Sequence, residues 1–287
     1  MDLVISTPKV PNMGETVIGS GFLATPGGKG ANQAVAASRL GGKVQMIGST
    51  GDDIFGVQLK DNLAGNGVDI RYVQTVKTAP SGIAVITIHQ GDNCIIIDPG
   101  ANNLLTPDNI DEKIITGCDM VMVQLEIPLD TVRHVIDIAY NANVPVLLNP
   151  APACFLPDEL LSKISIFTPN ETECGYFTGV EITSVEDAVN IIPKLLSRGI
   201  KQVVVTMGAN GAVFNDGSTI RHQQAPRVQV MDTTAAGDCF SAALAVAICE
   251  GMPIGEAVRF ACKAGSLAVQ KKGAQESLPY RADIELK

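Results

Sequence analysis

The stretch Asp119-Met-Val-Met-Val-Gln-Leu125 is an apolar run with the character of a buried β-strand. It is followed by helical spacing of apolar residues over Leu129–Ala142 and by a second apolar run, Val144–Leu148. Strand, amphipathic helix and strand in this order form a βαβ unit, in which the two strands are parallel. Because helices bury both faces of a parallel sheet, this stretch predicts an α/β fold.

The same alternation continues on both sides of this unit, in a chain of 287 residues of which 46% are hydrophobic. We therefore predict a mostly parallel central sheet between two layers of helices, a three-layer α/β sandwich. The further expected strands are Val44–Ile47, Ile164–Thr168 and Gln202–Thr206, and the further expected helices are Gly56–Gly65, Val185–Ser197, Gly237–Glu250 and Ile254–Gln270.

Two stretches interrupt the alternation. The first, residues 1–26, is rich in Pro and Gly and contains the strand-like Thr16–Ile18. In the second, residues 81–100, a Gln-Gly-Asp-Asn turn joins Gly82–Ile88 to Cys94–Ile97, which predicts an antiparallel hairpin. We expect both stretches to form a small β-sheet lid beside a core of residues 27–80 and 101–287. The alternative is an edge hairpin of the main sheet.

Composition excludes several classes of function. Lys and Arg number 21 and Asp and Glu number 30, a net charge of −9, whereas nucleic-acid binding needs a basic face. No apolar run reaches the roughly 18 residues of a membrane span, and no signal peptide is visible at the N-terminus. The seven cysteines are scattered without a CxxC pair. We expect a cytoplasmic protein with small-molecule ligands.

Two glycine-rich segments precede predicted helices. Gly27–Gln33 contains three glycines that let the backbone approach a ligand, while Lys29 and Asn32 offer donors to hydroxyl groups. It is not a Walker A loop, and a simple turn onto a helix is the alternative. Asp232–Asp238 would present backbone N–H groups at a helix N-terminus that suits a phosphoryl group. Asp238 there could accept a hydroxyl proton or merely cap the helix.

Three further segments follow predicted strands, where open α/β sheets bind ligands. In Thr168–Glu173, Asn170 could reach a phosphate and Glu173 could orient a water bound to magnesium, or the two could form a capping box. Thr206–Gly211 could approach a nucleotide closely or form a plain turn. Glu126 could bind sugar hydroxyls or be a solvated loop charge.

In this order, the segments resemble the ribokinase, or pfkB, family of carbohydrate kinases over essentially the whole chain. The resemblance implies a ribokinase-like fold and ATP-dependent phosphorylation of a sugar, with O5 of D-ribose as the expected acceptor. Deoxyribose, another sugar or a nucleoside as the substrate, or a catalytically weakened sugar-binding protein, are the alternatives. Family lids pair across a homodimer, so a homodimer through the lid is expected. The segments are Gly27–Gln33, Asn149–Pro152, Thr168–Glu173, Asp232–Phe240 and Lys272–Gln275.

The resemblance also implies roles for single residues. Asp238 matches the catalytic base, and Ala235, Ala236 and Gly237 match the anion hole for the γ-phosphoryl group. The expected sugar-binding residues are Asp2, Gly28, Lys29, Asn32 and Glu126, with Asp238. The expected nucleotide-binding residues are Asn170, Thr206, Met207, Gly208, Ala209, Asn210, Gly211, Gly237 and Cys262. Glu173 matches a position that binds Mg²⁺ through water, and the expected K⁺ site comprises Asp232, Thr234, Ala268, Lys271, Gly273 and Ser277.

One departure from the family pattern concerns the N-terminus. Family members have a strand ending in Gly-Ser-x-Asn before the position of Asp2, whereas this sequence begins at Met1. We therefore expect that strand and its sugar-binding Asn to be absent. Loss of a buried strand would expose apolar neighbours and cost several kcal/mol of stability.

Overall fold

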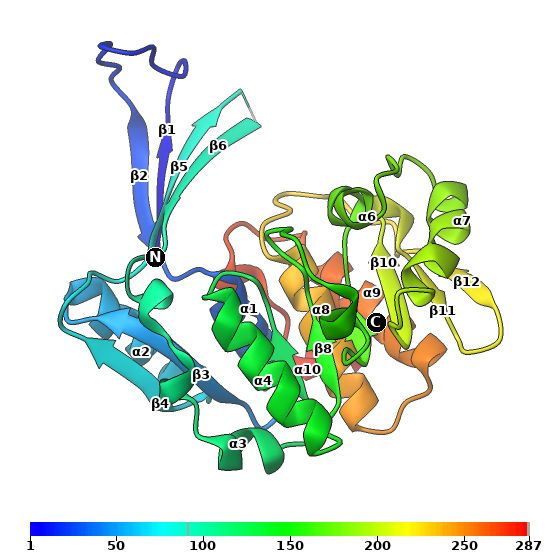
Figure 1. Ribbon diagram of the computed structural model, residues 1–287. Helices are drawn as coiled ribbons and strands as arrows, with labels where there is room; N and C mark the ends of the chain where they lie inside the picture. Colours follow the sequence, from blue (N-terminus) through cyan, green and yellow to red (C-terminus); the bar gives the residue numbers. More distant parts are fainter. Residues whose placement is uncertain (91, 286–287) are drawn as a thin grey trace.

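The computed structural model describes residues 1–90 and 92–285, and the parallel strands of its α/β core lie in two sheets (Figure 1). The larger sheet has six strands in the order β12-β11-β10-β9-β8-β7, of which β7 to β10 are parallel. A separate parallel pair is formed by β3 and β4. The bounds are β3 Gln45–Gly51, β4 Asp69–Val76, β7 Val121–Val123, β8 Val146–Leu148, β9 Ile166–Phe167, β10 Gln202–Thr206, β11 Ala212–Asn215 and β12 Ile220–Gln223.

Helices cover both faces of β7 to β10, and the residues of these four strands are therefore mostly buried. One hydrophobic cluster joins the strands to α1, α8 and α9, and the other joins them to α4 and α7. The predicted three-layer α/β architecture is confirmed. The helices are α1 Lys29–Arg39, α2 Ile54–Gly65, α3 Glu112–Thr116, α4 Leu129–Asn141, α5 Asp158–Leu161, α6 Glu171–Thr178, α7 Val185–Leu196, α8 Ala236–Cys249, α9 Ile254–Ala268 and α10 Arg281–Glu285, with 3₁₀ turns η1 Gly100–Leu104, η2 Pro107–Asn109, η3 Gly208–Asn210 and η4 Gln275–Ser277.

The division of the parallel strands into two sheets differs from the single sheet that we predicted. Among the described residues, β3 pairs only with β4, and β7 pairs only with β8. Side chains nevertheless bridge the two sheets, because Met46 of β3 and Met122 of β7 pack against the same hydrophobic cluster. Packing without a backbone ladder therefore joins the two sheets.

A third sheet stands apart from the others at the N-terminal end of the chain (Figure 1). Its order is β2-β1-β5-β6, with β1 parallel to β5 and antiparallel to β2. The hairpin predicted from residues 81–100 is confirmed, since β5 and β6 pair antiparallel. The hairpin therefore belongs to this small sheet and not to an edge of the main sheet. The bounds are β1 Asp2–Ser6, β2 Ser20–Thr25, β5 Ile83–His89 and β6 Asp92–Asp98.

The expectation of a strand at Thr16–Ile18 is wrong. Pairing between β1 and β2 starts only at Ser6 and Ser20, because the chain beyond Ser6 leaves the sheet in a segment that contains Pro8 and Pro11. Residues 16–18 therefore have no strand beside them to pair with. No helix in the described part of the chain is both long and apolar enough to cross a membrane.

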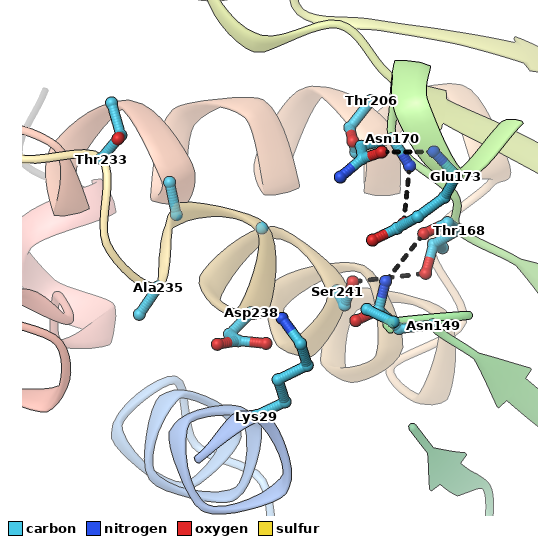
Figure 2. Close-up of a pocket in the computed structure, with 13 residues that line it drawn as sticks. Lys29, Asn149, Thr168, Asn170, Glu173, Thr206, Thr233, Ala235, Asp238 and Ser241 are labelled. Atoms are coloured by element: carbon cyan, nitrogen blue, oxygen red, sulfur yellow. Dashed lines mark hydrogen bonds between the residues drawn. The ribbon is translucent and has the colours of Figure 1, made fainter. Parts of the chain in front are cut away.

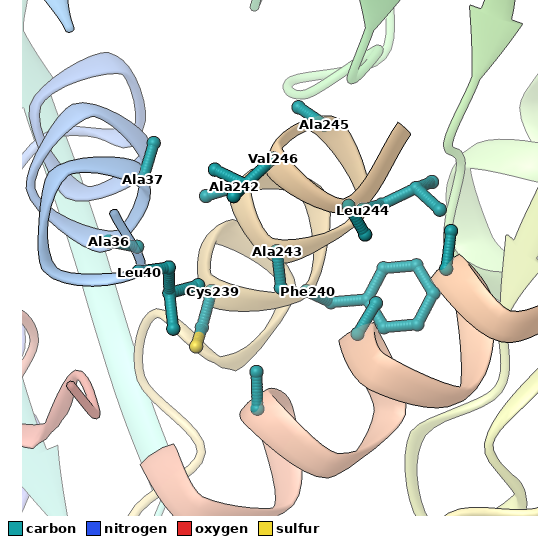
Figure 3. Packing of buried hydrophobic residues seen from close by; sticks show 14 of the residues in the cluster. Ala36, Ala37, Leu40, Cys239, Phe240, Ala242, Ala243, Leu244, Ala245 and Val246 are labelled. Atoms are coloured by element: carbon teal, nitrogen blue, oxygen red, sulfur yellow. The ribbon is translucent and has the colours of Figure 1, made fainter. Parts of the chain in front are cut away.

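Helices α1 and α8 approach each other closely because small side chains line their contact. Figure 3 shows Ala37 of α1 facing Ala242 of α8, and Leu40, the residue after α1, beside Cys239. Ala242 is completely buried. This contact fixes the N-terminus of α8 relative to α1, which matters because both helices begin at the candidate site.

Enlarging a side chain in this contact is expected to destabilise the fold. Ala242→Leu forces methyl groups into a filled interface and should lower the free energy of unfolding by about 1–3 kcal/mol. Denaturant unfolding measures the change. The matched control is Ala64→Leu, at an exposed position of α2, where the same enlargement meets solvent. Equal stability losses in the two variants would contradict the close packing of α1 and α8.

Candidate functional site

A pocket lies where the carboxyl ends of β8, β9 and β10 meet the N-terminus of α8 (Figure 2). The position follows from the topology, since parallel strands end at one edge of a sheet and the following loops gather there. Two of the sequence motifs, at the starts of α1 and α8, also reach this edge. The pocket is lined by Lys29, Asn149, Ala151, Thr168, Asn170, Glu173, Thr206, Thr233, Ala235, Ala236, Gly237, Asp238 and Ser241.

Asp238 is a buried carboxylate in the first turn of α8, with only 7% of the residue exposed. Asn32 Nδ2 donates a hydrogen bond of 2.9 Å to its Oδ2, and Gln33 Nε2 donates one of 3.0 Å to its Oδ1. Burial raises the pKa of Asp238 above its usual value, while the charge of Lys29 and the two amide bonds oppose that rise. The carboxylate is thus held in place by neutral donors and is more basic than an ordinary aspartate.

The amides around Asp238 are themselves fixed by further hydrogen bonds. Gln33 Nε2 also donates to Asn149 Oδ1 at 3.1 Å, and Asn149 Nδ2 donates to the carbonyl of Thr168 at 2.9 Å. Gln124 Nε2 donates to Gln33 Oε1. This network ties α1 to the ends of β8 and β9, so the orientation of Asp238 is set by three elements of the core.

The predicted sugar-binding residues lie together beside Asp238. The backbone N–H of Lys29 donates to Glu126 Oε2 at 3.0 Å. Asp2 packs against Gly27, where an added Cβ would lie 2.0 Å from Asp2 Oδ2, so a larger residue there would displace the Asp2 carboxylate. Gly28 precedes α1 with φ 93°, a conformation that favours glycine. Figure 2 shows the Lys29 side chain reaching toward Asp238.

Carboxylates raise one another's pKa at this site. Burial raises the pKa of Asp2, the Met1 ammonium group opposes the rise, and Asp238 adds to it. Burial likewise raises the pKa of Glu126, against the effects of Lys29, and Asp238 and Asp2 add to the rise. Like charges held this close to one another and partly out of water favour a cation or several hydroxyl donors as ligand.

The N-terminus of α8 is the second chemical feature of the pocket. Gly237 and Asp238 lie in the first turn, so their N–H groups have no acceptor within the helix. The N–H of Ala236 donates to the carbonyl of Thr233 at 3.2 Å. Ala235 adopts the left-handed conformation with φ 58°, which glycine would occupy without strain. A helix of 14 residues adds its dipole to these donors, which suits an anionic group.

Asn170 and Glu173 form the capping box that we gave as the alternative to a binding role. Asn170 Oδ1 accepts from the N–H of Glu173 at 2.8 Å, and Glu173 Oε2 accepts from the N–H of Asn170 at 2.9 Å. Both residues also line the pocket, toward which the Glu173 carboxylate extends (Figure 2). Burial raises the pKa of Glu173, while the bond from Asn170 and the charge of Lys29 oppose the rise.

The predicted nucleotide loop follows β10 as the turn η3. At Gly211, with φ 84°, an added Cβ would lie 2.0 Å from the carbonyl oxygen of Gln223. Cys262 Sγ lies 3.9 Å from the same oxygen. The structure therefore brings Cys262 close to this loop, in which Met207 is buried and the other predicted residues, Gly208, Ala209 and Asn210, lie at the surface. Thr206 lines the pocket.

Two of the predicted cation-binding residues, Thr234 and Gly273, contact Asp232. Asp232 Oδ1 accepts from Thr234 N at 2.9 Å and from Thr234 Oγ1 at 2.6 Å, and Oδ2 accepts from Gly273 N at 2.9 Å. Burial raises the pKa of Asp232, but these hydrogen bonds outweigh it and leave the pKa lowered. The N–H of Lys271 donates to the carbonyl of Ala268, and Ser277 Oγ donates to the carbonyl of Ala274.

Sequence reasoning assigned no role to several polar residues of the site. Gln33, Thr168 and Asn149 stood in quoted motifs, but their partners lie far away in the chain. Thr233 and Ser241 flank the helix N-terminus, and small polar residues there are common for reasons of packing alone. One feature of the sequence could have pointed to a role for Gln33. Asn32 and Gln33 are neighbouring amides at the start of α1, and both face inward.

Comparison with known proteins identifies a family of kinases. Residues 1–281 match the pfkB family carbohydrate kinases. The chain is 42% identical to the ribokinase of Bacillus subtilis over 288 residues, which cover 99% of this chain and 95% of that protein. It is 36% identical to the deoxyribokinase of Salmonella typhi, over 97% of this chain and 92% of that protein.

Among solved structures, the ribokinase of Arabidopsis thaliana complexed with ribose and ATP superposes with a TM-score of 0.94 at 36% identity. The match covers 99% of this chain and 94% of that one. The fold and the family match define a carbohydrate kinase. The chain belongs to the pfkB family.

Proposed function

We propose that this protein is a ribokinase, which transfers the γ-phosphoryl group of ATP to O5 of D-ribose. The observation that carries the proposal is Asp238, a buried carboxylate held by two amides at the N-terminus of α8, between the predicted sugar-binding residues and the nucleotide loop. The similarity to ribokinases at about 40% identity over the whole chain supports ribose as the substrate.

Asp238 acts as the general base in this proposal. Its carboxylate accepts the proton of the sugar hydroxyl as that oxygen attacks phosphorus. The pKa raised by burial makes Asp238 a stronger base, while the bonds from Asn32 and Gln33 keep it ionised and aimed. Lys29, Asn32, Glu126, Asp2 and Gly28 hold the hydroxyl groups of the sugar.

The N-terminus of α8 forms the anion hole. The N–H groups of Gly237 and Asp238 are directed outward from the first turn, where negative charge develops on the transferring group. The Ala235 N–H belongs to the same loop, and the Ala236 N–H must leave the carbonyl of Thr233 to join it. Such preorganised donors need no rearrangement of solvent at the moment of reaction.

Two cations complete the proposed site. Glu173 and Asn170 offer oxygen donors of the kind that Mg²⁺ binds directly or through water. Mg²⁺ neutralises phosphate charge in such kinases. Asp232 and the backbone around Thr234, Ala268, Lys271, Gly273 and Ser277 offer carboxylate and carbonyl oxygens that suit K⁺. A filled site there would order the loop that leads into α8. Thr206 to Gly211 and Cys262 bind the nucleotide.

The small sheet acts as the lid, comprising residues 1–26 and 81–100, over a core of residues 27–80 and 101–287. The lid excludes water from the phosphoryl group. Asp2 is the first residue of β1, so closure of the sheet and contact with the sugar are mechanically linked. Deoxyribose is the second candidate substrate, because the deoxyribokinase of Salmonella typhi is 36% identical to this chain.

Removal of the proposed base is expected to abolish most activity without unfolding the protein. Asp238→Ala should lower kcat by roughly two to four orders of magnitude, the usual contribution of a general base. Steady-state kinetics measure kcat, and thermal unfolding checks the fold. The control is Asp108→Ala, on the exposed turn η2. Turnover of Asp238→Ala close to that of the wild type would contradict the role.

Substrate and cation preference test the proposed reaction. With ATP and magnesium, we expect ribose to be turned over faster than deoxyribose, fructose or adenosine, with higher turnover in potassium than in tetramethylammonium, which is too large for a compact oxygen cage. A coupled ADP assay measures each rate. Faster turnover of deoxyribose would make deoxyribose the preferred substrate. Equal rates in potassium and tetramethylammonium would contradict the proposed potassium site.

A homodimer through the lid is expected from the apolar residues that the small sheet leaves exposed. β5 is an inner strand of this sheet, whereas β6 is an edge strand whose backbone is free to pair with a second chain. Ile96 is 67% exposed opposite Val85, on the face away from Asp2. Sedimentation should give a dimer for the wild type and a monomer for Ile96→Asp. A wild-type monomer would contradict the proposal, and Lys113→Asp in α3 is the control.

A further inference from the structure

Gln275 is a buried amide outside the pocket that connects two helices. Only 3% of the residue is exposed, in the turn η4. Its Nε2 donates to Asn32 Oδ1 at 3.1 Å, and its Oε1 accepts from Asn62 Nδ2 of α2. Both ends of the amide are therefore occupied, so Gln275 can take only one orientation.

The orientation of Gln275 dictates that of Asn32. An asparagine amide has an oxygen on one side and an NH₂ group on the other. Because Gln275 donates to Asn32 Oδ1, the NH₂ group of Asn32 faces Asp238 and donates to its Oδ2. If the Asn32 amide turned over, its oxygen would face the carboxylate and repel it. A chain of hydrogen bonds thus runs from Asn62 through Gln275 and Asn32 to Asp238.

We propose that Gln275 is a positioning residue for the phosphoryl transfer, which holds Asn32 in the one amide orientation that can donate to Asp238. The inference rests on the proposed function, since it assigns Asp238 as the base. Gln275 does not line the pocket and acts only through Asn32.

The neighbouring residue strengthens the case that η4 is held in a defined place. Glu276 Oε1 accepts from Thr25 Oγ1 at 2.6 Å, at the last residue of β2. The backbone carbonyl of Gln275 also accepts from Arg39 NH1 at 2.7 Å, at the end of α1. The turn is therefore anchored to α1 and β2 independently of the Gln275 side chain. Removal of that side-chain amide should leave the turn in place and affect Asn32.

The test is Gln275→Met, which keeps the length of the side chain and removes its amide. We expect kcat with ribose and ATP to fall roughly 10- to 100-fold, the scale of a misaligned catalytic group. The acid limb of the kcat/KM profile should move to higher pH, because the Asn32 bond lowers the pKa of Asp238. The charged groups around Asp238, namely Lys29, Asp2, Glu126 and Glu173, are unchanged in this variant.

A double-mutant cycle separates positioning from general loss of structure. In an Asn32→Ala background, Gln275→Met should change kcat less than twofold, because the residue through which it acts is gone. Losses that multiply would overturn the proposal. Thr131→Val is the structural control: it removes a buried hydrogen bond to the carbonyl of Leu105, neither residue lines the pocket, and the acid limb should stay in place.

The outcome does not depend on the proposed substrate. NMR titration of ¹³C-labelled aspartate carboxyls follows Asp238 directly, and its pKa should be higher in Gln275→Met than in the wild type. If the wild type phosphorylates no sugar, the proposed function is wrong. The effect of Gln275 on the pKa of Asp238 can still be measured in that case. An unchanged pKa overturns the inference. If Gln275→Met does not fold, Gln275→Glu keeps the acceptor for Asn62 and must still lower kcat, with an unaltered kcat as the contrary result.

Discussion

The buried carboxylate of Asp238 is the constraint on which the arrangement of the molecule depends. An ionised group with 7% exposure is tolerated only where hydrogen bonds replace its water. Two adjacent amides at the start of α1 supply them, so α1 must lie against α8 at a fixed distance and rotation. The small residues between the two helices allow this approach. Packing and electrostatics therefore require the same geometry of α1 and α8.

The carboxylates around Asp238 lower the stability of the folded protein. Asp2, Glu126 and Glu173 all have a pKa raised first by burial and then by the charge of Asp238. Groups whose pKa is raised on folding oppose the folded state when they are ionised, near neutral pH. Lys29 offsets part of this repulsion. A ligand that adds hydroxyl donors or a cation would relieve it further, so binding and stability are linked at this site.

The sequence was sufficient to predict the layers of the fold and to single out many of the residues that line the pocket, because these depend on local patterns. Apolar periodicity located β10 to the residue, and the small residues before α8 indicated a helix start that lies at the pocket. What could not be predicted depends on contacts between distant residues. Gln33 and Asp238 are 205 positions apart, and Asn32 and Gln275 are 243 apart. Thr16–Ile18 has strand-forming residues but no strand beside it, and propensity alone cannot reveal a missing partner.

Structural and catalytic interpretations of one motif need not compete. Asn170 and Glu173 form a complete capping box, yet each uses only some of its lone pairs in the cap. The cap holds the Glu173 carboxylate in one rotamer at the pocket wall, which a metal-bound water would need. Ala235 is the converse case, because its left-handed backbone strains the loop while it turns the first N–H groups of α8 toward the pocket. The capped start of α6 thus orients the Glu173 side of the pocket, and the strained start of α8 orients the opposite side.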